Sequence, residues 1–323
     1  MHPSDVLFQD ARQPVTLPVC DHYAGSEKLM RKSLALQLAL GPVFDITFDC
    51  EDGAAAGDEL AHAQLVGQLI ASDENRFGRI GARVHDVDHP DFEQDVATIC
   101  ALAAERLAYL VIPKIHGSRQ LEQAAALISR HASAAGRPDL PVHVLIETHG
   151  ALREVWDIAA QPAVECLSFG IMDFVSAHYG AIPGEAMRSP AQFSHPLISR
   201  AKLEIAAACH ANGKVPSHNV CTEIRDGSVV ASDARLASKQ FGYQRMWSIH
   251  PDQIRHILAA FAPEASEIED AAAILRAASD KDWGPIQHKN TLHDRASYRY
   301  YWTVLQRARQ TGQALPKEAD GLL

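Results

Sequence analysis

Ionisable side chains recur in this sequence where short apolar runs end. The residues are Asp49, Glu51, Asp52, Arg83, Lys114, Glu147 and Asp173. Carboxylates held a few ångströms apart repel one another strongly unless a cation neutralises them. If the ends of these runs meet in the fold, the sequence predicts a divalent cation bound there by oxygen ligands.

The types of ligand favour a hard cation. The six cysteines are scattered, and the sequence contains neither a Cys-x-x-Cys pair nor a His-Glu-x-x-His motif. Mg²⁺ prefers oxygen ligands and usually takes one or two carboxylates, leaving positions for water and substrate, and Mn²⁺ is the alternative. Glu147 and Asp173 follow neighbouring runs and suit that description.

Arg83 and Lys114 supply positive charge for an anionic substrate. Arg83 is the stronger candidate, because the guanidinium fork matches a carboxylate in two places. For any one of these residues, a solvated loop charge or a structural ion pair is the plain alternative. Because these residues recur together at the ends of successive apolar runs, a functional site is favoured over isolated charges.

Eight short apolar or β-branched runs alternate with amphipathic helical stretches and predict eight strands. They cover residues 15–20, 44–50, 78–85, 107–115, 141–148, 163–170, 214–220 and 243–249. Eight strand–helix units of roughly 30 residues each predict a (β/α)8 TIM barrel, whose sites lie at the C-terminal ends of the strands. An open doubly wound sheet is the alternative, but it more often has fewer strands, and no Gly-x-Gly-x-x-Gly follows the first run.

Caps and breakers suggest where the helices begin and end. We expect Ser118 and Ser232 to open helices and Gly213 and Gly242 to follow helix ends. A further helix is expected over 266–278. Beyond it the sequence becomes richer in polar and aromatic residues, so we expect a catalytic barrel over 1–278 and a helical lid extension over 279–323.

Composition limits the partners of the chain. The 323 residues include 40 acidic and 30 basic side chains, a formal net charge of −10. This balance disfavours a nucleic-acid surface or a polybasic membrane tether. No apolar run approaches the roughly 18 residues of a membrane span. We expect a cytoplasmic enzyme acting on small molecules.

Seven stretches resemble, in order, the motifs of the HpcH/HpaI aldolase and citrate lyase β-subunit superfamily. They are FDITFDCEDGAAAGDE (44–59), RVHDVDHP (83–90), VIPKI (111–115), IETHGAL (146–152), LSFGIMDF (167–174), FGYQRMWSIHPDQI (241–254) and FAPEASEIEDAAAIL (261–275). The resemblance covers about residues 15 to 310 and is to the branch with malyl-CoA and citramalyl-CoA lyases. Each motif is loose alone, but seven in the right order are specific.

The resemblance implies a Mg²⁺-dependent carbon–carbon lyase that acts on malyl-, citramalyl- or citryl-CoA and releases or uses a 2-oxo acid. It makes Glu147 and Asp173 the metal ligands. It assigns Glu51 and Asp52 to catalysis, where they hold metal-bound water or shape its surroundings. Arg83 would clamp the carboxylate of glyoxylate, pyruvate or oxaloacetate.

The resemblance also implies a binding segment, a lid and an assembly. The backbone of Gly170, Ile171, Met172 and Asp173 would bind the same end of the substrate. Family members usually form trimers or hexamers in which a C-terminal lid reaches a neighbouring subunit. LHDRASYRYY (292–301) matches the lid motif, which makes Asp294 the expected acid/base. A charge at a helix N-terminus, favoured by the helix dipole, is the alternative.

The chain departs from the family pattern at three places. It lacks the arginine of the usual R-S-x-L-x-x-P segment, has His85 where an asparagine is usual, and has His149 in place of a proline and an arginine. His22, His85 and His149 are candidates to line the mouth of the barrel, at the C-terminal ends of the strands, and their roles are left open. The acyl partner and the reaction direction are open too, and a thioester hydrolase or a non-catalytic metabolite-binding barrel are the rival functions.

Overall fold

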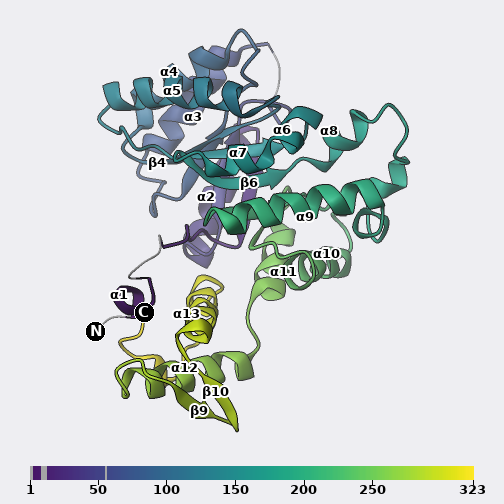
Figure 1. Ribbon diagram of the computed structural model, residues 1–323. Coiled ribbons are helices and arrows are strands. Elements are labelled where there is room, and N and C mark those ends of the chain that lie inside the picture. Colours follow the sequence, from purple (N-terminus) through teal and green to yellow (C-terminus); the bar gives the residue numbers. More distant parts are fainter. Residues whose placement is uncertain (1–2, 9–12, 55–56) are drawn as a thin grey trace. The chain divides into compact units, whose positions relative to one another are not determined.

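A closed barrel of eight parallel strands forms the main part of the protein (Figure 1). The computed structural model describes residues 3–8, 13–54 and 57–323. The strands are β1 (Cys20–Ala24), β2 (Asp45–Asp49), β3 (Ile80–Arg83), β4 (Leu107–Ile112), β5 (Val142–Ile146), β6 (Val164–Phe169), β7 (Val215–His218) and β8 (Arg245–Ser248). Neighbouring strands pair in chain order and β8 closes on β1, so the predicted (β/α)8 barrel is confirmed.

Helices follow the strands in alternation. They are α2 (Glu27–Leu40), α3 (Glu59–Ala71), α4 (Phe92–Ala103), α5 (Ser118–Ala134), α6 (His149–Arg153), α7 (Val155–Ala160), α8 (Ile171–Ser176), α9 (Pro196–Ala211), α10 (Gly227–Lys239) and α11 (Pro251–Phe261), with short 3-10 turns at Gly184–Met187 and Ala191–Phe193. In α4, Phe92, Val96 and Ile99 recur three and four apart and are buried, as an amphipathic helix requires. Helices α3, α4 and α5 lie side by side along one flank (Figure 1).

Two local predictions were wrong. The first strand begins at Cys20, where the predicted run 15–20 ends, so Asp21 and Tyr23 lie within β1. Ser232 lies inside α10, whose N-cap is Asp226, with its side chain accepting the Ser228 N–H. The expected stops agree with the structure, because Gly213 and Gly242 have φ values of 64° and 73° shortly after the ends of α9 and α10.

Beneath the mouth, the barrel interior holds a buried ionic cluster around Arg245. This arginine is fully buried, lies 3.0 Å from Asp21 Oδ2 and pairs with Asp45. The hydroxyls of Thr47 and Tyr109 donate to Asp21 Oδ1 at 2.8 and 3.1 Å. Pairing of this kind lets charges persist in a low-dielectric interior.

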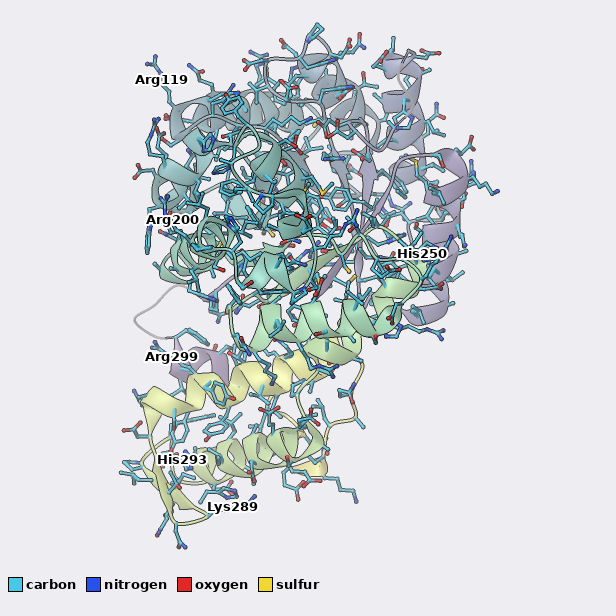
Figure 2. The ribbon with its side chains drawn as sticks, turned by 90° about the vertical axis from the view of Figure 1, so that its right-hand side faces the viewer. Arg119, Arg200, His250, Lys289, His293 and Arg299 are labelled. Carbon is cyan, nitrogen blue, oxygen red and sulfur yellow. The ribbon has the colours of Figure 1, made fainter. Side chains whose placement is uncertain are left out.

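A second compact unit combines the described residues up to Pro14 with Phe261–Leu323. It contains α1 (Pro3–Leu7), α12 (Ala265–Ser279), the hairpin of β9 (Ile286–His288) and β10 (Thr291–His293), α13 (Arg295–Gln310) and a 3-10 turn at Lys317–Ala319. Figure 2 labels Lys289 and His293 in the hairpin and Arg299 on α13, where Arg299 Nε donates to the Leu7 carbonyl at 2.7 Å. The domain division at 278/279 and the docking of the extension on a neighbouring subunit stay predictions.

Within the described part of the chain, no helix combines the length and apolar character needed to cross a membrane.

Candidate active site

Two carboxylates come together where β5 and β6 end. The strands run in parallel with Ile146 beside Phe169, so the residues that follow them emerge at the same edge of the barrel. Glu147 is the next residue after β5, and Asp173 lies in the first turn of α8. Burial, followed by the negative charge of Asp173, raises the pKa of Glu147 to about 8.

Gly170 lets the Glu147 carboxylate lie against the backbone of the neighbouring strand. A Cβ at position 170 would fall 2.7 Å from Glu147 Cβ and 3.0 Å from its Cδ, and closer still to Oε2. Real Cβ atoms essentially never come within 3.0 Å of another heavy atom. Residue 170 must therefore be glycine if Glu147 is to keep this position.

The donor chemistry of the pair fits a hard divalent cation. A cation shared by Glu147 and Asp173 would remove the repulsion that helps to raise the Glu147 pKa. Among the residues that the structure describes, no group of three or more His, Cys, Asp or Glu side chains is placed to hold a metal. Two carboxylates with the remaining positions left to water and substrate is an arrangement that Mg²⁺ commonly adopts.

Arg83, at the end of β3, is held by two carboxylates. Its Nε and Nη2 donate to the two oxygens of Asp49 at 2.7 and 2.6 Å, and its Nη1 lies 2.7 Å from Glu51 Oε2. The backbone N–H groups of Glu51 and Gly53 donate to Asp49 in turn, at 3.0 and 2.9 Å. The guanidinium therefore has one orientation, with the Nη1 edge shared with Glu51.

Lys114 connects this ionic group to Glu147. Its backbone N–H donates to Glu147 Oε1 at 2.7 Å, while its ammonium group binds Glu51 and lies 3.1 Å from Asp52 Oδ2. The residue has φ +50°, a left-handed conformation that non-glycine residues rarely adopt and that concentrates at functional sites. Five predicted site residues thus share one connected network: Arg83, Glu51, Asp52, Lys114 and Glu147.

Tyr23 and Trp247 line the interior just below this network, and neither is among the site residues predicted from the sequence. Their rings stack with centroids 4.7 Å apart and 21° between planes. The Arg83 guanidinium carbon lies 5.5 Å from the centre of the Tyr23 ring. The alternation of Asp21 with Tyr23 could have indicated the inward face of β1, but only with the strand placed at Cys20–Ala24.

The first turn of α8 follows directly from β6. Ile171 is buried and Met172 is 44% exposed, so their side chains face opposite environments. The first N–H groups of a helix have no acceptor within it and are available to an anion or to water. The predicted binding segment Gly170–Asp173 therefore lies beside Glu147. The Gly170 N–H donates to the Ile146 carbonyl at 3.2 Å, so the backbone donors of the segment are the N–H groups of the residues that follow it.

The three histidines that distinguish the chain lie in different surroundings. His22 is buried and packs outside the barrel lumen, with Nδ1 3.0 Å from Ser248 Oγ. His85 is half-buried, with Nδ1 2.7 Å from the buried Asp95 carboxylate. His149 is exposed, and its Nε2 lies 3.0 Å from the Ala177 carbonyl.

Asp294 belongs to the second compact unit. It is exposed and is the N-cap of α13, where its carboxylate accepts the Ala296 N–H at 3.0 Å. The structure describes it within its own unit, so its role at the barrel mouth stays a prediction.

Comparison with known proteins identifies the family. The family model described as HpcH/HpaI aldolase/citrate lyase matches residues 31–251. The chain belongs to this family. The resemblance predicted from seven ordered motifs is confirmed.

Proteins similar to this chain include a characterised enzyme and two proteins with crystal structures. The L-malyl-CoA/beta-methylmalyl-CoA lyase of Cereibacter sphaeroides is 27% identical over 86% of this chain and 91% of its own. A crystal structure of a citrate lyase from Burkholderia xenovorans LB400 is 58% identical, covers 100% of both chains and has a TM-score of 0.86. Protein CitE from Mycobacterium tuberculosis, in complex with magnesium, acetoacetate and coenzyme A, shares the fold at 20% identity, with a TM-score of 0.68 over 91% of this chain and 99% of its own.

Proposed function

We propose that this protein is a Mg²⁺-dependent carbon–carbon lyase. Its substrate would be a 3-hydroxyacyl thioester such as malyl-, citramalyl- or citryl-CoA, cleaved to or formed from a 2-oxo acid. The observation that carries the proposal is the buried Glu147 beside Asp173, next to the cationic Arg83 and Lys114. The malyl-CoA lyase relative supports the reaction class.

Glu147 and Asp173 would hold the metal, and Mn²⁺ is the alternative ion. When bound there, Mg²⁺ supplies Lewis acidity to the oxygens of a 2-oxo acid. The magnesium complex of the M. tuberculosis relative supports this choice of ion. Glu51 and Asp52, which face Lys114, would order water beside the metal.

Arg83 would bind the carboxylate of the 2-oxo acid at its Nη1 edge. An incoming carboxylate displaces Glu51 from Nη1, while Asp49 keeps the other edge and so fixes the guanidinium. Glu51 retains Lys114 as a partner after this exchange. Within the Gly170–Asp173 segment, the backbone N–H groups of Ile171, Met172 and Asp173 would donate to the same end of the substrate.

Asp294 would act as the general acid/base at the acyl carbon. In condensation, its carboxylate removes a proton from the acyl methyl group, and the carbon left with the electron pair forms a bond to the oxo carbon of the 2-oxo acid. The oxo oxygen takes the electron pair of the broken C=O π bond and a proton from water, which gives the 3-hydroxyl group. In cleavage, the 3-hydroxyl gives up its proton to water, the carbon–carbon bond breaks as the oxo group re-forms, and Asp294 returns a proton to the acyl carbon. We propose that a neighbouring copy in a cytoplasmic homotrimer or homohexamer delivers Asp294.

The test is turnover of malyl-, citramalyl- and citryl-CoA before and after chelation with EDTA. We expect EDTA to abolish turnover and added Mg²⁺ to restore it, and activity indifferent to chelation would defeat the proposal. Calorimetry should show that Glu147→Gln and Asp173→Asn no longer bind Mg²⁺. Release of free CoA without a 2-oxo acid would instead identify a thioester hydrolase.

A further inference from the structure

His149 connects the two short helices that belong to the proposed metal ligands. Helix α6 begins with His149, just beyond Glu147, and α8 carries Asp173 in its first turn. The Nε2 atom of His149 lies 3.0 Å from the carbonyl oxygen of Ala177, the C-cap of α8 (Figure 1). A carbonyl oxygen can only accept a hydrogen bond, so Nε2 carries the proton and donates it.

This hydrogen bond has no substitute among the described residues. It is the only one there that joins α6 to the segment 171–178. The ring of His149 adds contacts to the same segment, because its centroid lies 6.2 Å from that of Phe174 and 4.6 Å from that of His178. The connection between the two helices therefore depends on one side chain.

Helix α8 needs such support, because it is short and leads into an exposed loop. It has 6 residues, and a helix of that length is marginal by itself. Tyr179, shortly after it, is 96% exposed and has φ +52°. The Ala177 N–H donates to the Asp173 carbonyl at 2.9 Å. The residue that His149 holds is thus bonded directly to the backbone of Asp173.

The two carboxylates differ in how they are fixed. Glu147 accepts the backbone N–H of Lys114 and lies closely against Gly170. Among the described residues, none donates a hydrogen bond to the Asp173 carboxylate, so its position depends on the backbone of α8. Mg²⁺ requires near-ideal octahedral geometry with short bonds to oxygen. A shift of α8 would therefore weaken the binding of the ion.

We propose that His149 is a positioning residue for the metal site, because its hydrogen bond to Ala177 sets where α8 holds Asp173 relative to Glu147. This inference rests on the proposed Mg²⁺-dependent function. It assigns a role to a histidine that stands where the family pattern has a proline and an arginine.

The test is calorimetric titration of the metal-free protein with Mg²⁺, for the wild type, His149→Phe and His149→Gln. Phenylalanine keeps a ring against α8 and removes the donor, whereas glutamine places an amide N–H close to the position of Nε2. We expect His149→Phe to weaken Mg²⁺ binding about tenfold to a hundredfold, as for other groups that orient metal ligands. His149→Gln should restore an affinity close to that of the wild type.

A spectroscopic measurement reports on the metal surroundings directly. With Mn²⁺ bound, the electron paramagnetic resonance spectrum of His149→Phe should differ from that of the wild type, and the spectrum of His149→Gln should match it. A purely structural role of His149 would leave the spectrum of the folded protein unchanged.

The matched control is His210→Phe. His210 is also exposed, and its Nε2 donates to the Gly242 carbonyl at 2.7 Å. Gly242 precedes β8, at the end of the barrel away from the mouth. This variant loses a hydrogen bond of the same kind, so it should lower the melting temperature about as much as His149→Phe does while leaving Mg²⁺ affinity unchanged.

Each outcome decides the matter. If His149→Phe binds Mg²⁺ as tightly as the wild type, if His149→Gln binds no better than His149→Phe, or if His210→Phe weakens binding equally, the positioning role is wrong while the lyase function stands. If the wild type binds no Mg²⁺, the proposed function itself fails and this inference falls with it.

Discussion

Replacing Gly170 with alanine tests whether the position of Glu147 matters to the site. The new Cβ would lie 2.7 Å from Glu147 Cβ, whereas carbon atoms pack best at about 3.5–4.0 Å. Relief of the clash requires Glu147 to move by about 1 Å, and a displacement of that size costs on the order of a hundredfold in rate when it affects catalytic geometry. Overpacking of this kind destabilises by about 1–3 kcal/mol.

The assay for Gly170→Ala combines Mg²⁺ titration, turnover and thermal unfolding. We expect weaker Mg²⁺ binding, turnover reduced on the order of a hundredfold and a melting temperature lowered by about 2–12 °C. The matched control is Gly184→Ala, because a Cβ there meets only Met187 Cε at 3.8 Å and should leave all three measurements near wild type. A Gly170→Ala protein with wild-type metal affinity and turnover would refute the assignment of Glu147 to the metal.

Three further changes test other parts of the reasoning. Arg245→Met leaves the buried Asp21 without a cation and leaves Asp45 with Arg79 alone, and it should cost about 3–5 kcal/mol in chemical denaturation. Arg200→Met, which breaks an exposed i,i+4 pair, should cost under about 0.5 kcal/mol. The pKa of Glu147 is raised from 4.5 to about 8, so the stability that its protonation gives the metal-free fold is complete below pH 4.5 and is lost as the pH rises to about 8. The gain in melting temperature on adding Mg²⁺ should therefore grow from pH 6 to about 8 and level off above it, and an unchanged gain would contradict the shift. Asp294→Ala should lose turnover while keeping Mg²⁺ affinity in calorimetry, and full activity would remove Asp294 from the mechanism.

The barrel could be predicted because its signals are local. Alternating apolar runs and amphipathic helices depend on neighbours a few residues apart, and α4 shows this directly. The nearness of Glu147 and Asp173 followed from two adjacent parallel strands. Both inferences needed only the order of the strands and the rule that sites lie at their C-terminal ends.

The place of β1 could not be predicted, since it depends on a distant partner. The run 15–20 contains β-branched residues, whereas Asp21 and His22 disfavour a strand on local grounds. Asp21 lies in the barrel because Arg245 of β8 pairs with it. The same error concealed Tyr23, whose inward direction becomes visible only when the strand and its register with β8 are known.

The ion pair between Glu51 and Arg83 could not be predicted from the sequence either. Spacing placed both residues at the mouth, but it could not show that Asp49 occupies two of the three donor nitrogens of the guanidinium. Side-chain pairing of this kind is decided by rotamers and by competition among nearby charges, which no one-dimensional pattern encodes.

Lys114 contacts both sides of the barrel mouth, Glu147 on one side and the acidic residues after β2 on the other. A single peptide unit supports the buried glutamate, and the side chain of the same residue anchors the acidic loop after β2. Lys114→Gly keeps the amide and the left-handed turn but deletes the ammonium group, so this one position separates the two supports experimentally.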